Sequence, residues 1–113
     1  MTRMPSLSRP LVLEERVRTP DGAGGFSEVW TALGSLWAEL KAGSGRETGE
    51  NFVTLSRVPY RISVRAAPQG APSRPKADHR FVDGSRIFTI LAVTEAGTDG
   101  KFLICNALEE VVT

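Results

Sequence analysis

The sequence predicts a mainly β protein, in which an antiparallel sheet closes into a small barrel or a sandwich. Three observations predict it. Short apolar runs are separated by glycine turns, above all Asp83-Gly84 and Asp99-Gly100. Residues 58–66 alternate between apolar and polar side chains, as a strand with one buried face does. Residues 67–78 hold three prolines and a glycine and cannot form a regular element, so a long loop interrupts the sheet.

The totals are those of one soluble domain covering residues 1–113. Hydrophobic residues make up 41% and charged residues 24% of the chain, which is ordinary for a globular protein. No apolar run approaches the ~20 residues that cross a bilayer. The N-terminus lacks the apolar stretch of a signal peptide, so we expect synthesis in the cytoplasm and no membrane partner. Cys105 is the one cysteine, which excludes an intramolecular disulfide, and we expect it to pack as a small hydrophobe.

The N-terminal part predicts an arm, a strand and a turn. Residues 1–10 carry two prolines and few apolar side chains, and we expect a flexible arm there. Residues 11–18 form a candidate strand. Pro20-Asp21-Gly22 is a turn signal, and Gly24-Gly25 extends that corner.

The segment after this turn has a helical period but a mixed composition. Its apolar residues recur at helical spacing: Phe26, Val29, Trp30, Leu33, Trp37 and Leu40. Ser27 could cap a helix there. The valine, threonine and tryptophan content instead favours a strand, and Gly34 would cost a helix about 1 kcal/mol relative to alanine. On periodicity alone the helix is the favoured interpretation.

The rest of the chain predicts loops and strands. A loop around Glu47 follows. Tyr60, Ile62 and Val64 share one face of the strand at 58–66, and residues 66–78 form the extended loop. Residues 79–95 are predicted to form a hairpin about Asp83-Gly84, and a last strand covers 102–107.

The charge is strongly polarised although the formal net charge is only +1. Residues 57–80 hold six basic residues and one acid, a net charge of +5, and the remainder holds eight basic and twelve acidic residues, a net charge of −4. A basic loop can meet phosphates, or it can keep itself soluble or pair with acidic neighbours. The first interpretation makes this segment a partner-binding or channel-facing region; its candidate residues are Arg61, Arg65, Arg74, Lys76, His79 and Arg80.

The sequence predicts no enzyme, no cofactor and no metal site. His79 is the only histidine, too few for a catalytic triad or a histidine-based metal site, and we expect it to be a solvated residue at a strand edge. The Asp21–Gly25 stretch lacks the spacing and the lysine of a nucleotide-binding loop. The acidic pairs at 14–15 and 109–110 point to opposite faces of a strand, so we expect solvated edges or intersubunit contacts.

The order of these motifs resembles the phage head–tail joining proteins, also called head-closure or stopper proteins, and the versions in gene transfer agents. The resemblance spans about residues 11–108. Its matching positions are Asp21, Gly22, Gly24, Gly25, Trp30, Leu36-Trp37-Ala38-Glu39, Gly45, Glu47, Ile62, Val64-Arg65, Arg80, Gly84, Arg86, Phe88 and Ile90. No single motif is specific, and the resemblance rests on their order and spacing together. The proline- and alanine-rich segment at 66–78 departs from the family pattern.

The resemblance implies a small β-barrel that assembles as a ring at the portal vertex of a phage or gene transfer agent particle. Such a ring sits between the portal-bound adaptor and the tail terminator or tail tube, closes the DNA exit channel and gives the tail its docking platform. It implies six copies, with twelve as the alternative, and non-specific contact with DNA in the channel. The strongest competing interpretation is a small OB-like barrel that binds nucleic acid, and the second is a small enzyme subunit or regulatory module. The basic segment has only Tyr60 as an aromatic, which disfavours base stacking.

With this resemblance and the neighbouring hairpins, the prediction for residues 26–40 becomes a long bent strand. Strand alternation would put Trp30 and Trp37 on opposite faces unless a β-bulge shifts the register. We therefore predict a bulge near Gly34, which would let both tryptophans enter the core.

Overall fold

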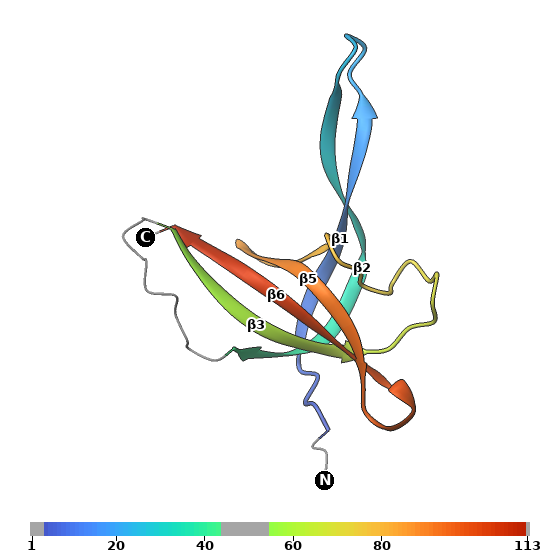
Figure 1. The fold of residues 1–113 in the computed structure, drawn as a ribbon, viewed down its shortest axis with the longest axis vertical. Coiled ribbons are helices and arrows are strands. Elements are labelled where there is room, and N and C mark those ends of the chain that lie inside the picture. The colour runs from blue at the N-terminus through green and yellow to red at the C-terminus, as the bar shows by residue number, and fades with distance from the viewer. Residues whose placement is uncertain (1–3, 44–54, 113) are drawn as a thin grey trace.

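The protein forms a closed antiparallel β-barrel. Its structure is a computed structural model that describes residues 4–43 and 55–112. Gly45 and Glu47 lie outside these residues. The described chain runs through six strands and one short 3₁₀ turn (Figure 1). The elements are β1 (Arg9–Pro20), β2 (Phe26–Ala42), β3 (Leu55–Arg65), β4 (Arg80–Asp83), β5 (Arg86–Ala96), η1 (Thr98–Gly100) and β6 (Phe102–Val112). The prediction of a mainly β fold is confirmed.

The strands pair in the order β1-β2-β3-β6-β5-β4, and β4 returns to β1 to close the barrel. That last seam is short, because β1 pairs with β4 only from Val12 to Glu14. Closure leaves no free edge within the barrel, which removes a site for unwanted strand pairing. The hairpin predicted at Asp83-Gly84 forms between β4 and β5, with Asp83 opposite Arg86.

The core lies on the inner face, where alternate residues of every strand meet. It consists of Leu11, Leu13, Ala38, Ile62, Val64, Phe81, Phe88, Ile90, Leu103, Cys105 and Ala107. The predicted inward face of β3 is confirmed, with Tyr60 packed against this cluster. Cys105 is fully buried, as predicted, and burial raises the pKa of its thiol to about 12. The thiol is therefore protonated at neutral pH and serves as packing.

The segment with the helical period is a strand, and it carries the predicted bulge. Leu13 pairs with Gly34 and Glu14 with Ala32, which leaves Leu33 as an extra residue on β2. Gly34 has φ 146°, a conformation open essentially to glycine alone. The helix suggested by periodicity alone is wrong, because the apolar residues of β2 serve both sides of the sheet.

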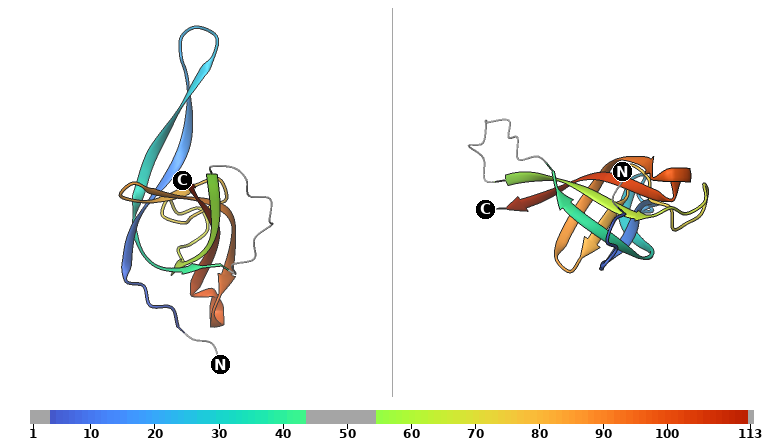
Figure 2. Two further views of the ribbon diagram at one scale, coloured as in Figure 1. Left: turned by 90° about the vertical axis from the view of Figure 1, so that its left-hand side faces the viewer. Right: turned by 90° about the horizontal axis from the view of Figure 1, so that it is seen from below.

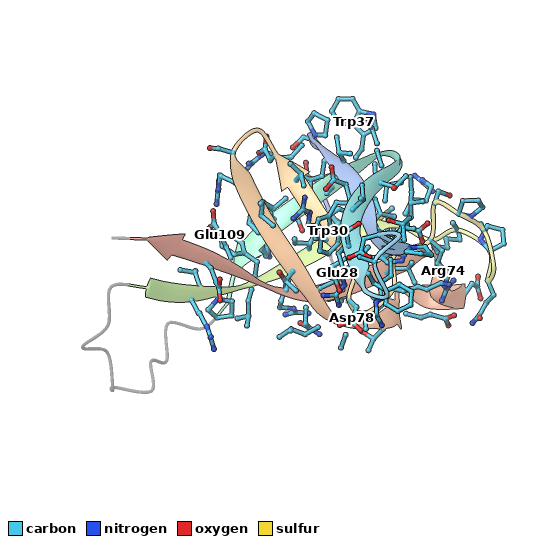
Figure 3. The ribbon with its side chains drawn as sticks, turned by 90° about the horizontal axis from the view of Figure 1, so that it is seen from above. Glu28, Trp30, Trp37, Arg74, Asp78 and Glu109 are labelled. Atoms are coloured by element: carbon cyan, nitrogen blue, oxygen red, sulfur yellow. The ribbon has the colours of Figure 1, made fainter. Side chains whose placement is uncertain are left out.

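The bulge does not bring the two tryptophans into the core, so that expectation is wrong. Beyond Gly34, buried Ala38 defines the inward positions, and Trp37 points outward with 60% of its surface exposed. Figure 3 shows this side chain pointing away from the barrel. Trp30 is half-buried, and it lies before the bulge, where β2 no longer pairs with β3.

Replacing Gly34 with alanine should cost about 1–3 kcal/mol of unfolding free energy, because a side chain there must adopt a strained backbone conformation. Nothing lies within 4 Å of the added Cβ, so any loss comes from the backbone and not from a clash. Urea denaturation measures the change. Ser35→Ala, at the neighbouring exposed position, is the control and should change stability by less than about 0.5 kcal/mol. Equal stability of both variants would contradict the strained bulge.

The most prominent feature outside the barrel is a projecting hairpin, here called the hairpin arm, which comprises residues 15–31. Past Glu14, β1 pairs only with β2, and the two strands rise from the barrel to the tip at residues 21–25 (Figures 1 and 2). The arm makes the molecule elongated, with extents of 56 × 40 × 21 Å and a radius of gyration of 15.6 Å. A compact chain of this length has a radius of gyration of about 13 Å.

Asp21 holds the tip of the arm in shape. Its Oδ1 accepts hydrogen bonds from the backbone N–H groups of Ala23 and Gly25, at 2.8 and 3.0 Å, and these bonds lower the pKa of the carboxyl. The turn predicted at 20–25 is thus present. Local patterns indicate projecting parts at residues 1–10 and 66–78 and do not reveal this arm. β1 instead begins at Arg9, and Ser8 N–H donates to the Ala38 carbonyl.

Candidate interaction surfaces

The proline-rich loop, residues 66–79, folds against the barrel. Pro75 is fully buried. Arg74 is only 16% exposed at its side chain: Nη1 donates to the Ala67 carbonyl at 2.7 Å, and Nη2 lies 3.7 Å from the Glu95 carboxylate. Arg74 therefore holds the two halves of the loop together, and Lys76 is the exposed basic residue of this segment.

His79 is mostly covered, so the expectation of a solvated histidine is wrong. Its side chain is 11% exposed, its Nδ1 accepts a hydrogen bond from Lys76 N–H at 3.2 Å, and its Nε2 lies 4.0 Å from Glu15 Oε1. Burial lowers the pKa of the imidazole, which favours the neutral form at pH 7. Asp78 before it has φ 74°, and the His79 N–H donates to the Lys76 carbonyl at 3.1 Å, which closes a tight turn.

Arg80 fastens the base of the hairpin arm to β4. Its Nε donates to Glu14 Oε1 at 2.7 Å, and its guanidinium lies 4.0 Å from the centre of the Trp30 ring. Arg16 approaches the same ring at 5.6 Å. An arginine over a tryptophan face adds about 0.5–2 kcal/mol. Arg80 and Trp30 therefore set the direction in which the arm leaves the barrel.

A second arginine cluster joins β5, β6 and β3. Arg86 binds both carboxylate oxygens of Glu109, at 2.8 and 3.0 Å, and donates to Tyr60 Oη at 3.1 Å. Phe88 packs edge-on against Tyr60 at 5.2 Å. Glu109 is buried and not a solvated edge, which corrects the expectation for the acidic pair. Tyr60 faces inward and cannot stack on bases, which weakens the nucleic-acid interpretation.

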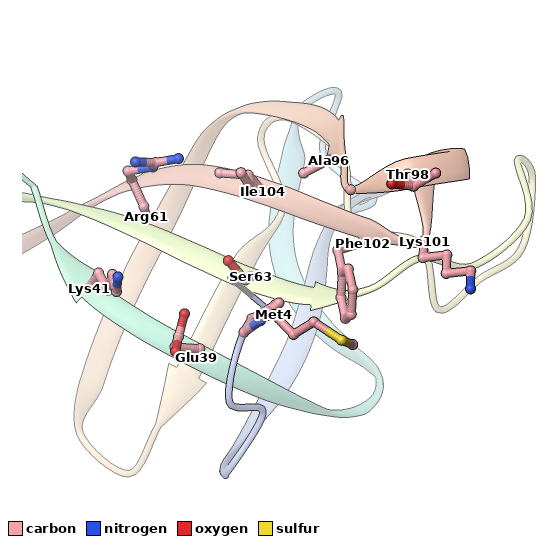
Figure 4. Close-up of a pocket in the computed structure, with 12 residues that line it drawn as sticks. Met4, Glu39, Lys41, Arg61, Ser63, Ala96, Thr98, Lys101, Phe102 and Ile104 are labelled. Carbon is pink, nitrogen blue, oxygen red and sulfur yellow. The ribbon is translucent and has the colours of Figure 1, made fainter. Parts of the chain in front are cut away.

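A groove lies on the outer face of β2, β3 and β6, between the N-terminal segment and the β5–β6 turn (Figure 4). We call it the basic groove. Its volume is about 420 Å³, Phe102 and Ile104 form part of its apolar lining, and Lys41, Arg61 and Lys101 supply positive charge. Glu39, which accepts a hydrogen bond from Ser6 N–H, is its acidic member.

Two cations of the basic groove oppose each other directly. Lys41 pairs in register with Arg61 across β2 and β3. Like charges at such a site destabilise a sheet, by the same physics that makes opposite charges stabilise it. The side chains of Lys41, Arg61 and Lys101 form no hydrogen bond or ion pair with any residue in 4–43 or 55–112. The groove is therefore electrostatically unsatisfied and suited to a negatively charged occupant.

The structure separates the basic residues that the sequence grouped. Arg61 and Arg65 lie exposed on the outside of β3, with Arg65 over the Phe102 ring at 5.8 Å. Arg74, His79 and Arg80 bind within the loop and the base of the arm, as described above. Lys41 and Lys101 belong to the groove and were missed, since only strand pairing brings them to Arg61. The outward alternation of Lys41 along β2 was the available signal.

An apolar stripe crosses the outside of β2, β1, β4 and β5. Pro10 faces Trp37, Val12 faces Val82, and Val82 faces Ile87. Trp37 and Ile87 are 60% and 40% exposed. An exposed tryptophan beside other apolar side chains is typical of a protein interface.

The described residues show neither a metal site nor a membrane helix. No three His, Cys, Asp or Glu side chains come together there in a way that could hold an ion. Within the same part of the chain, no helix has the length and apolar character needed to span a bilayer. What the described surface offers is the hairpin arm, the basic groove and the apolar stripe.

Comparison with known proteins identifies a family and a similar chain in a solved structure. The family described as "Phage head completion protein" matches residues 2–111. A chain in the structure of the "Virion of native gene transfer agent (GTA) particle" is similar at 55% sequence identity with a TM-score of 0.84. That match covers 97% of this chain and 100% of that one. No curated protein matches the chain.

Proposed function

The chain belongs to the phage head completion protein family, and on this basis we propose that it is a structural protein of a phage or gene transfer agent particle, acting as the head-closure ring. In this role several copies form a ring between the portal-bound adaptor and the tail terminator or tail tube. The ring closes the DNA exit channel after packaging and gives the tail its platform. Six copies are favoured over twelve.

The observation that carries this proposal is the near-complete match to a chain of a gene transfer agent virion, at 55% identity. Two features of the described surface support it. The hairpin arm extends beyond the barrel and exposes Phe26 and Val29, at 59% and 50%. The apolar stripe exposes Trp37. Such surfaces are suited to burial in an assembly.

The charge pattern supports an oriented ring. Fewer basic residues are available for contacts between subunits than the sequence indicated. Arg57, Arg74 and Arg80 lie within salt-bridge distance of Glu110, Glu95 and Glu14 of the same chain. Arg61, Arg65 and Lys76 are exposed and remain available to a partner or to DNA phosphates in the channel. Complementary charges fix the register and orientation of neighbouring subunits.

Genetic replacement in a particle-producing strain tests the proposal. Without the gene, we expect heads that lack tails, either filled with DNA or leaking it, and electron microscopy counts them. Leaking heads should contain less nuclease-protected DNA. Infectivity or gene transfer should be lost. The wild-type gene should restore tailed particles, and labelled protein should locate at the head–tail junction. Normal tailed particles without the gene, or protein located elsewhere, would overturn it.

Charge reversal in the same assay tests the exposed cations. A triple variant should reduce the number of tailed particles at least tenfold; it combines Arg61→Glu, Arg65→Glu and Lys76→Glu in one chain. The purified triple variant should keep the circular dichroism spectrum of a folded β protein. Arg74 is left unchanged because it holds the loop. Ser85→Glu, in the exposed β4–β5 turn, is the control and should assemble normally. Normal assembly of the triple variant would mean that these cations do not serve the ring.

A further inference from the structure

We propose that the hairpin arm of one copy docks into the basic groove of the next copy, so that arm and groove form the repeating contact of the ring. This inference rests on the proposed function above and names the residues of its subunit contact. It arises from two described surfaces that lie far apart on one chain and complement each other in charge and apolar character.

The two surfaces lie toward opposite ends of the molecule. The tip of the arm marks one end of the longest axis, of 56 Å, and the N-terminal segment and β5–β6 turn that flank the groove lie at the other end (Figures 1 and 2). An arm therefore cannot fold back into the groove of its own chain. Contact between unlike surfaces of two identical copies is heterologous, and it generates a closed ring when the rotation between copies closes.

Charge complementarity favours the arm as the occupant of the groove. The outer end of the arm, residues 18–28, contains Asp21 and Glu28 against Arg18, a net charge of −1. Glu28 faces Arg18 across the hairpin and lies 3.8 Å from Arg16, so Asp21 at the tip is the carboxylate left to a partner. The groove carries Lys41, Arg61 and Lys101 against Glu39, a net charge of +2. Docking would place the Asp21 carboxylate near the opposed Lys41 and Arg61, and so relieve the repulsion between these two cations.

The apolar parts also match. Phe26, at the start of β2, is 59% exposed and covered on one side only by the Arg18 guanidinium, at 4.7 Å. The groove offers Phe102 and Ile104 to an entering side chain, and its volume of about 420 Å³ lies in the range of about 300–1,000 Å³ found for binding sites. An aromatic anchor in an apolar pocket with charged surroundings is how strong contacts are usually built.

The arm is ordered before docking, which lowers the entropic cost of the contact. Asp21 fixes the tip through its two backbone hydrogen bonds, Thr19 Oγ1 lies 3.2 Å from Ser27 Oγ across the hairpin, and Arg80 on Trp30 fixes the base. A preorganised element loses less conformational freedom on binding than a flexible one.

Cysteine cross-linking in assembled particles tests the contact. Ala23→Cys at the arm tip and Ser63→Cys in the groove are combined in one chain, and particles are treated with a short bis-maleimide. Buried Cys105 should not react. We expect a ladder of covalent multimers that ends at the ring number. Each single cysteine should give no ladder. Ala23→Cys combined with Ser85→Cys, outside the groove, is the matched control and should give none either.

A charge exchange provides the second measurement. Asp21→Asn with Ala23→Lys keeps the hydrogen-bonding oxygen of the tip while reversing the charge of the tip, and should reduce tailed particles at least tenfold. Lys41→Glu with Arg61→Glu should do the same. A chain with all four substitutions should recover to within about threefold of wild type, because opposite charges meet again.

The outcomes separate this inference from the proposed function. Tailed, DNA-filled particles that contain the double-cysteine protein at the head–tail junction but give no ladder would overturn the arm–groove contact and leave the ring proposal standing. Failure of the four-substitution chain to recover, although each pair alone assembles poorly and folds, would also overturn it. Absence of the protein from the head–tail junction would overturn the proposed function itself.

Discussion

Replacing Phe81 with alanine should destabilise the barrel by about 3–5 kcal/mol, the range measured for removal of a buried aromatic side chain. Phe81 is fully buried and lies in the middle of β4, which is only four residues long. Its neighbours are Leu13 on β1 and Phe88 on β5. The cavity would therefore form at the short seam that closes the barrel, where few other contacts can compensate.

Urea denaturation, followed by tryptophan fluorescence or circular dichroism, measures this change. A loss of this size approaches the total stability of a small domain, so the variant should be partly unfolded at 37 °C. Val82→Ala, the next residue on the outer face of β4, is the control and should cost less than about 1.5 kcal/mol. If the two variants lost equal stability, Phe81 would not be the residue that holds the seam.

Replacing Arg86 with leucine should cost about 2–3 kcal/mol, because it leaves the Glu109 carboxylate buried without its partner. The value lies below that of a fully buried pair because the Arg86 side chain is 39% exposed. Replacing both residues with leucine should restore much of the loss, since an apolar pair needs no charge compensation. Chemical denaturation of the wild type and of both variants measures these changes in unfolding free energy; a double variant no more stable than Arg86→Leu would contradict the pairing.

The same pair makes the stability depend on pH. Arg86 lowers the pKa of Glu109 below its ordinary value of 4.5, so the folded protein binds fewer protons than the unfolded chain. The contribution of the pair is present above pH 4.5 and is lost as the pH falls through the lower folded pKa. In Arg86→Leu, burial should instead raise the Glu109 pKa. Acidification from about pH 7 to about pH 4 should therefore narrow the stability gap between wild type and variant, and a constant gap would contradict this linkage.

The hairpins and the inner face of the barrel could be predicted because their signals are local. Asp83-Gly84 lies at the turn it indicated, and the alternation of Ile62 and Val64 shows directly which face of β3 is buried. The bulge at Gly34 was also predictable, because a glycine inside a long strand often marks a bulge or a tight bend. In each case one to three neighbouring residues carry the information.

Periodicity was misleading for Phe26–Ala42, because this strand changes surroundings along its length. Its first part belongs to the hairpin arm and its second part to the barrel, with Leu33 inserted between them. The apolar residues of the two parts therefore face different surroundings, and together they happen to recur at helical spacing. The same change accounts for Trp30 lying beneath Arg80 while Trp37 faces outward.

The candidate surfaces depend on pairing between distant strands, which no local pattern records. Residues 57–80 are basic in sequence, yet Glu14 lies 66 positions before the arginine that it binds. Lys41 meets Arg61 only because β2 and β3 are adjacent and in that register.

The sequence by itself determined the mainly β character, the turns and the family resemblance, because composition, alternation and motif order are properties of neighbouring residues. The tertiary structure alone decided which charges remain unpaired, which tryptophan is exposed, and that the hairpin arm and the basic groove lie toward opposite ends. These are consequences of barrel closure: the strand order β1-β2-β3-β6-β5-β4 juxtaposes residues far apart in the chain, and only their contacts show which side chains are left for a partner.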